Sequence, residues 1–159
     1  MSNNNNFTII VDTREQKPWE FTEYATAVRK LDTGDYSVEG LEQILCIERK
    51  RNVSEIANNI TESRFKDVLS RMSKYRFPFI LLEFDLQQVL DFPVGSDIPK
   101  SVWPKIKISP KYILKCILEM SLVYNIYVIF CGSKSNAEIY ATSIMKKVYD
   151  KYGNQQEII

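Results

Sequence analysis

Short apolar runs along the chain alternate with longer stretches in which apolar residues recur at helical spacing. Residues 7–11 and 79–84 are nearly continuous apolar runs, which predict buried strands. Residues 33–38 and 43–50 predict a hairpin that turns across Gly40. This order of elements predicts an α/β domain with a central mixed sheet flanked by helices.

The remaining periodic segments predict helices and one further strand. Helices are expected at residues 24–31, 54–61, 63–75, 110–124 and 136–152, and a strand at residues 126–131. Residues 91–109 are rich in proline and lack periodicity, which predicts a long loop. Such a loop is often functional, and it can be mobile, cover a substrate groove or cross the domain in an ordered form.

Length and composition limit the class of protein. A chain of 18.6 kDa with 45% hydrophobic residues is long enough for one domain with a single core, which we place at residues 7–153. We expect residues 1–6 to form a disordered polar tail and residues 154–159 a C-terminal tail. The chain lacks a signal-like start and a membrane-length apolar stretch, and its three cysteines are widely spaced. These features predict a soluble intracellular protein, in the cytoplasm, nucleoid or nucleus.

The charged residues narrow the possible chemistry. None of the 159 residues is histidine, which excludes Ser-His and Cys-His nucleophilic triads and histidine-dependent zinc sites. The net charge is only +1, so any surface for nucleic acid must be local. The densest basic region, residues 49–76, contains Arg49, Arg51 and Arg64, which we expect to contact DNA phosphates together with Arg14.

Two carboxylates and a lysine, Asp35, Glu48 and Lys50, are the main candidates for catalysis. Side chains alternate along a strand, so Glu48 and Lys50 should emerge on one face, while Asp35 enters from the preceding strand. A Mg²⁺ ion is commonly bound by one or two carboxylates plus waters where a phosphate is the substrate. Lys50 would orient the attacking water or stabilise the developing charge. The pattern predicts metal-dependent cleavage of a phosphodiester.

The end of the first predicted strand supplies a second charged group. Asp12, Arg14 and Glu15 follow residues 7–11, and strand ends are where an α/β scaffold presents its chemistry. We expect Asp12 to ligate the metal ion or position its water. Because side chains alternate, Glu15 is expected to face away from Asp12.

Three motifs resemble the signature of one nuclease family. The sequences Val-Asp-Thr-Arg-Glu at residues 11–15, Gly-Asp-Tyr at 34–36 and Ile-Glu-Arg-Lys at 47–50 resemble the XPF-type nuclease domain. This domain is shared by the XPF, MUS and archaeal Hef structure-specific endonucleases. The resemblance extends over about residues 7–85. One position departs from the family pattern: Ser54 stands where the pattern has Asp, and we expect its hydroxyl to cap the following helix.

The resemblance implies a restriction-endonuclease-like fold and a metal-dependent endonuclease acting on branched, flapped or otherwise structured DNA, in repair or recombination. It implies that Asp35 and Glu48 coordinate Mg²⁺, or Mn²⁺, with the Arg49 carbonyl as a further ligand. Arg14 and the Arg49 side chain would contact phosphate or hold the carboxylates in place. It also implies a homodimer formed through the C-terminal helices.

Two alternatives remain open at this point. A non-catalytic DNA-binding or scaffolding subunit of the same fold is one, which Ser54 favours weakly and the retained Asp35, Glu48 and Lys50 disfavour. A metal-dependent phosphohydrolase acting on a small nucleotide is the other, but the chain has no glycine-rich phosphate-binding loop.

Overall fold

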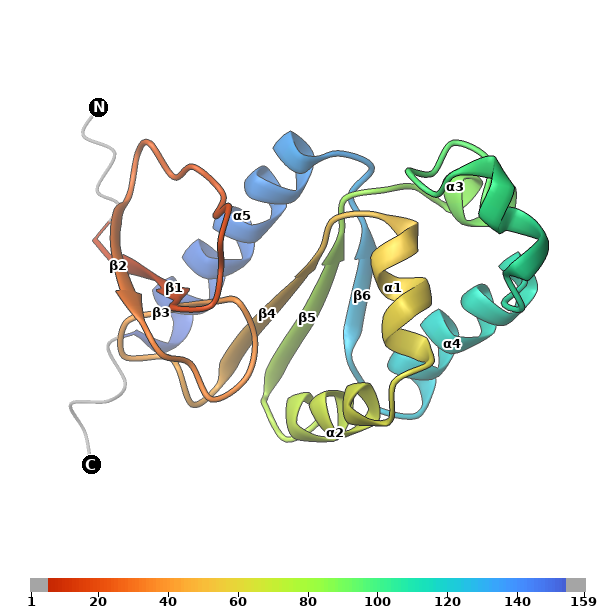
Figure 1. Cartoon of the computed structure of the whole chain (residues 1–159). Coiled ribbons are helices and arrows are strands. Elements are labelled where there is room, and N and C mark those ends of the chain that lie inside the picture. Colours follow the sequence, from red (N-terminus) through yellow and green to blue (C-terminus); the bar gives the residue numbers. More distant parts are fainter. Residues whose placement is uncertain (1–5, 154–159) are drawn as a thin grey trace.

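The structure is a computed structural model that describes residues 6–153. The two predicted tails therefore lie outside the described residues, except for Asn6. Within this range a six-stranded mixed sheet has the strand order β2-β1-β3-β4-β5-β6 (Figure 1). Its strands are β1 (Thr8–Asp12), β2 (Ala25–Arg29), β3 (Tyr36–Val38), β4 (Leu45–Lys50), β5 (Phe77–Leu82) and β6 (Tyr127–Phe130).

Both parallel and antiparallel pairing occur in this sheet. Strand β3 runs antiparallel to β1 and to β4, whereas β1 with β2, β4 with β5 and β5 with β6 are parallel pairs. The predicted hairpin and the predicted central strand are present as β3 with β4 and as β5. The prediction of a central mixed sheet is confirmed.

Helices cover both faces of the sheet. They are α1 (Val53–Ile60), α2 (Ser63–Met72), α3 (Leu86–Asp91), α4 (Pro110–Leu122) and α5 (Lys134–Tyr152), with a 3₁₀ helix η1 at Lys100–Lys105. Helix α5 packs with alternate residues of β1, β3 and β4 on one face, and α1, α2, α3 and α4 pack on the other face of β4 and β5. Figure 1 shows these four helices gathered on one side of the molecule.

The side chains of β4 divide between these two hydrophobic clusters. Leu45 and Ile47 pack in the cluster that contains α5, and Cys46 packs in the cluster that contains α1. Alternation then places Glu48 and Lys50 on the α1 face and Arg49 on the α5 face. The division of β4 decides which charged groups meet at the candidate site.

The helix predicted at residues 24–31 is wrong, because this segment contains strand β2. Residues Ala25–Arg29 pair in parallel with Thr8–Asp12 along the whole of β1. The strand lies at the sheet edge with no fully buried residue, so its sequence carries no apolar stripe of strand period. Hydrogen bonding to β1 decides the conformation here over a weak local propensity.

The long connection after β5 is an ordered crossing. Residues 91–109 follow α3, form η1 and return to α4, with Ile98, Ile106 and Ile108 packed against the hydrophobic cluster on the α1 face. Of the alternatives that the sequence left open, the ordered form is the one observed. In the described part of the chain, no helix is both long enough and apolar enough to cross a membrane.

Candidate active site

Asp35 lies where β1, β3 and β4 approach one another. Its N–H donates to the Ile47 carbonyl at 2.8 Å, and its own carbonyl accepts from the Asp12 N–H at 2.8 Å. The Arg49 N–H donates to Asp35 Oδ2 at 2.8 Å. Backbone contacts with two neighbouring strands therefore fix the position of this carboxylate.

Gly34 allows the chain to make this approach. Its φ is +90°, and a Cβ atom added there would lie 2.6 Å from Cys46 Sγ and 3.2 Å from the Ile47 carbonyl oxygen. Glycine tolerates this left-handed conformation without a steric penalty. The Gly-Asp pair of the sequence motif thus has a physical reason, since the glycine brings the following aspartate against β4.

A polar cavity of about 240 Å³ opens beside Asp35. It is lined by Arg14, Glu15, Gln16, Asp35, Glu48, Arg49, Arg51 and Glu55. The predicted convergence of Asp35 and Glu48 on one cavity is thus present in the structure.

The charged forms of Asp35 and Glu48 are unfavourable in this cavity, because both carboxylates are desolvated and they repel each other. Burial raises the pKa of Asp35 well above its ordinary value, and the nearby charge of Glu48 raises it further, although the Arg49 N–H opposes both effects. Burial also raises the pKa of Glu48, while Lys50 lowers it in part. A cation between the two carboxylates would relieve both the desolvation and the repulsion. The pair therefore has the electrostatics of a site for a positive ion.

Lys50 lies on the same face as Glu48, as the strand alternation predicts. Its Nζ atom is 3.4 Å from Glu48 Oε1 and 3.7 Å from Glu55 Oε1, and it lies 5.3 Å from the Phe65 ring centroid. The side chain is buried, so its charge acts in a medium that screens weakly. Glu55, in the first turn of α1, is a cavity residue that the sequence did not single out as catalytic.

The Arg49 side chain lies on the opposite face and is engaged with protein groups. Its guanidinium contacts both carboxylate oxygens of Glu83, donates to the Lys17 carbonyl at 2.7 Å and lies 5.1 Å from the Trp19 ring centroid. Glu15 Oε1 is 3.9 Å away. Of the two roles expected for this side chain, the geometry favours holding carboxylates over contacting phosphate. In a β-strand, the carbonyl of a residue points in the same direction as the N–H of that residue. The Arg49 N–H points toward Asp35, so the Arg49 carbonyl does as well.

Asp12 does not line the cavity. Its carboxylate accepts hydrogen bonds from the Arg14 side chain at 2.7 Å, from the Leu31 N–H at 2.8 Å and from the Arg14 N–H at 3.2 Å. Burial raises its pKa, but these hydrogen bonds outweigh burial and the net pKa is lowered. Asp12 therefore orients Arg14, whose guanidinium lies within electrostatic reach of Asp35 and Glu48.

Glu15 occupies the place that the sequence suggested for Asp12. It lines the cavity and pairs with Arg51 at 2.5 Å, whereas Asp12 does not line it. The two acidic side chains diverge, but Glu15 reaches the cavity in place of Asp12. Arg51 is partly exposed at the cavity wall. Arg64 is 84% exposed, pairs with Glu62 and lies in the first turn of α2. It does not line the cavity.

Comparison with known proteins identifies the family. A model of the ERCC4 domain matches residues 11–142, which is most of the chain. The chain belongs to the ERCC4 domain family. No curated protein matched the chain significantly.

Solved structures share the fold of this ERCC4 domain. XPF from Aeropyrum pernix aligns with a TM-score of 0.67 at 17% identity, covering 94% of this chain and 69% of that chain. XPF from Aeropyrum pernix in complex with DNA aligns with a TM-score of 0.66 at 18% identity, covering 91% and 66%. The predicted XPF-type family and restriction-endonuclease-like fold are confirmed.

The helix cap of the ERCC4 domain's first helix differs from the sequence expectation. Asn52, and not Ser54, caps α1 by accepting from the Glu55 N–H at 2.8 Å. Ser54 lies inside the first turn, and its hydroxyl is 2.9 Å from Asp97 Oδ1. At the position where the family pattern has an acidic residue, a serine thus contacts an acidic residue from the connection before η1.

The donor groups of this ERCC4 domain fit a divalent ion that keeps several of its waters better than an ion coordinated entirely by protein side chains. Among residues 6–153, no group of three or more histidine, cysteine, aspartate or glutamate side chains is placed to hold a metal ion. A Mg²⁺ ion, however, often keeps several waters and takes only one or two carboxylates from the protein. Asp35 and Glu48, with the Arg49 carbonyl beside them, match that requirement.

Proposed function

We propose that this ERCC4 domain is a metal-dependent endonuclease that hydrolyses phosphodiester bonds in branched, flapped or otherwise structured DNA. The carrying observation is the pair of desolvated carboxylates, Asp35 and Glu48, in one polar cavity beside the buried ammonium of Lys50. Membership of the family supports a nuclease role. The solved relative with DNA bound supports DNA as the substrate.

Each residue of the site has a distinct proposed role. Asp35, Glu48 and the Arg49 carbonyl would hold Mg²⁺ or Mn²⁺, which when bound supplies charge stabilisation and an acidified water. Lys50 would stabilise the negative charge that develops on the phosphate. Its contact with Glu48 keeps the ammonium close to the carboxylate pair.

The surrounding arginines would bind the substrate. Arg14 is held by Asp12 yet 66% exposed, so its free N–H groups can meet a phosphate of the strand being cut. Arg51 also lines the cavity, where it forms an ion pair with Glu15. Arg64 lies outside the cavity and would contact DNA only at a distance from the cleaved bond.

A cleavage assay tests this proposal. Labelled flap, fork and plain duplex DNA are incubated with Mg²⁺ or Mn²⁺ and the wild-type protein, Asp35→Asn or Glu48→Gln. Incision of structured DNA that depends on metal and is lost in both variants is expected. Asp67→Asn is the matched control, because Asp67 is an exposed carboxylate on α2.

The same assay decides between this function and the alternatives. DNA binding without incision would assign the chain to a non-catalytic subunit. Turnover of free nucleotides without DNA incision would favour the phosphohydrolase instead.

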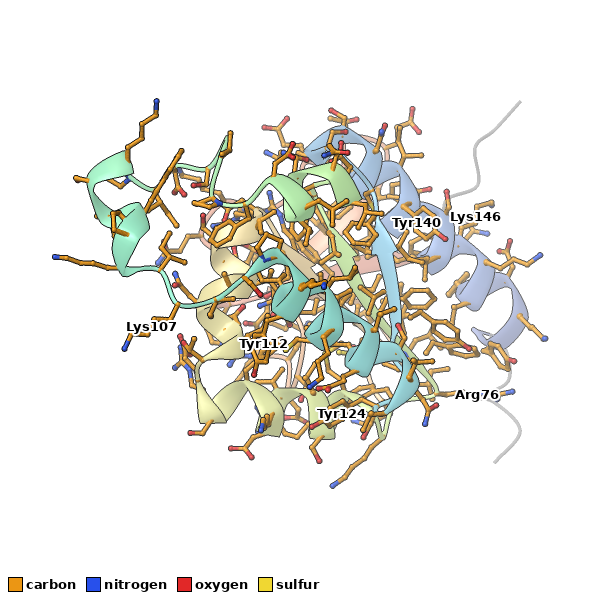
Figure 2. All side chains as sticks on the ribbon, turned by 90° about the vertical axis from the view of Figure 1, so that its right-hand side faces the viewer. Arg76, Lys107, Tyr112, Tyr124, Tyr140 and Lys146 are labelled. Carbon is orange, nitrogen blue, oxygen red and sulfur yellow. The ribbon has the colours of Figure 1, made fainter. Side chains whose placement is uncertain are left out.

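We further propose that the chain forms a homodimer through α5 and the adjoining edge of the sheet. An apolar groove of about 410 Å³ lies there, lined by Phe77, Phe79, Tyr127, Tyr140, Ser143, Ile144, Lys147 and Val148. Tyr127 and Tyr140 are 53% and 41% exposed, which is typical of an interaction surface. Figure 2 shows Tyr140 and Lys146 on this side of the molecule.

Sedimentation of the wild-type protein and of Tyr140→Glu tests the dimer, which the variant should weaken.

A further inference from the structure

The connection between α3 and α4, together with the first turn of α4, carries a cluster of lysines that the proposed active site does not use. Residues 98–112, here called the η1 arm, contain Lys100, Lys105, Lys107 and Lys111 and no acidic residue. All four lysines are exposed. Within the described residues, none of the four forms an ion pair, whereas Lys115 and Lys146 on α4 and α5 each have an acidic partner.

The η1 arm contacts the rest of the domain through its apolar residues. The Trp103 indole N–H donates to the Ile98 carbonyl at 3.0 Å, and the Lys100 ammonium lies 5.9 Å from the Trp103 ring centroid. Ile106 and Ile108 pack against the hydrophobic cluster, and the exposed Lys105 and Lys107 alternate with them. Two lysines are thus displayed side by side on the outer face of the arm.

The arm is also tied to the wall of the candidate active site. Asp97, just before the arm, accepts a hydrogen bond from Ser54 in the first turn of α1. The next residue of that turn, Glu55, lines the cavity with Asp35 and Glu48. Lys100 is three residues from Asp97, a separation of at most about 11 Å, which corresponds to about three base steps of duplex DNA. Figure 2 shows the arm projecting from the domain with Lys107 directed outward.

We propose that the η1 arm binds the sugar-phosphate backbone of the DNA next to the cleaved bond, through Lys100, Lys105 and Lys107. This inference rests on the proposed function, because it places the arm beside a cavity that cuts DNA. A row of exposed lysines without acidic partners among residues 6–153 complements a polyanion of regular spacing. Contacts of this kind position a duplex and carry no base specificity.

The test compares two double variants with the same change of charge. Lys105→Ala/Lys107→Ala removes two arm lysines, and Lys30→Ala/Lys115→Ala, the control variant, removes two exposed lysines that lie outside the arm, the candidate active site and α5. Binding of a labelled fork is measured by fluorescence anisotropy without metal, from 50 to 200 mM salt. In the arm variant, the slope of log affinity against log salt should be smaller in magnitude by about 2 than in the wild type. Raising the salt from 50 to 200 mM should therefore weaken binding by the wild type roughly tenfold more than binding by the arm variant.

Cleavage kinetics provide a second readout. The arm variant should raise KM with little change in kcat, because the arm touches no reacting atom. A salt slope equal to that of the wild type, or an equal change in the control variant, would overturn the inference.

The two proposals can fail separately. Incision by the wild-type protein together with unchanged binding by the arm variant would refute the arm alone. Weaker binding by the arm variant without any incision by the wild type would refute the catalytic proposal and leave the arm in place. Absence of DNA binding by the wild type would refute both.

Discussion

Replacing Asp35 by Asn should make the metal-free protein more stable while abolishing cleavage. The Asn carbonyl oxygen can still accept the Arg49 N–H, so the geometry of the β3 to β4 contact is retained. What is lost is a desolvated negative charge that faces Glu48. Removing a poorly compensated buried charge should raise the free energy of unfolding by roughly 1–3 kcal/mol.

The stability gain should depend on pH in a defined direction. Because folding raises the pKa of Asp35, the folded protein keeps this proton at pH values where the unfolded chain has released it. Wild-type stability therefore falls as pH rises from the unfolded value of about 3.9 through the raised pKa. The Asn variant lacks this loss, so its advantage should be absent at low pH and greatest above the raised pKa.

Thermal unfolding of both proteins in a chelator, followed by circular dichroism across this pH range, measures the effect. A gain of about 2 kcal/mol corresponds to a rise in Tm of about 4–8 °C for a domain of this size. Adding Mg²⁺ should then stabilise the wild type and not the variant, since only a species that binds the folded state raises Tm. A pH-independent difference, or a variant less stable than the wild type at neutral pH, would refute the electrostatic reasoning.

Three other substitutions have expected outcomes that follow from single contacts. Lys50→Met leaves Glu48 without its ammonium partner and should lower kcat by about 10²–10³-fold at saturating metal and DNA, measured in single-turnover cleavage. Arg49→Met leaves the Glu83 carboxylate buried and unpaired, and urea denaturation should show a loss of about 3–5 kcal/mol in the free energy of unfolding. Gly34→Ala forces a side chain into a left-handed conformation against β4 and should cost roughly 1–3 kcal/mol, measured in the same way.

Matched controls separate these mechanisms from general effects of substitution. Arg29→Met breaks an exposed pair with Glu39 and should cost at most about 1 kcal/mol. Gly95→Ala is also at positive φ, but its added Cβ would meet no atom within 4 Å. A loss at Gly34 no larger than that at Gly95 would show that backbone strain, and not contact with Cys46, limits the position. An effect of Arg49→Met as small as that of Arg29→Met would contradict the importance of burial.

The sequence by itself determined the central strands, the later helices and the main catalytic candidates. Strand alternation is a local property, so the positions of Glu48 and Lys50 on one face could be predicted from β4 alone. Asp35 was marked by the Gly-Asp-Tyr motif alone, and the structure supplies the reason for its glycine, which has positive φ and lies against Cys46 and Ile47 of β4. Three motifs in order also sufficed to predict the family, which the match to the ERCC4 domain confirms.

Tertiary structure alone decided β2, the direction of Asp12 and the environment of Arg49. Strand β2 exists because β1 offers a free edge, and an edge strand with no buried face leaves no apolar pattern in its sequence. Asp12 is the last residue of β1, and its carboxylate is held by hydrogen bonds from Leu31 and Arg14 away from the cavity. Glu15 lies beyond the end of β1, where strand alternation no longer applies, and it lines the cavity instead. The partners of a charged side chain are set by segments distant in sequence, and local periodicity contains no information about them.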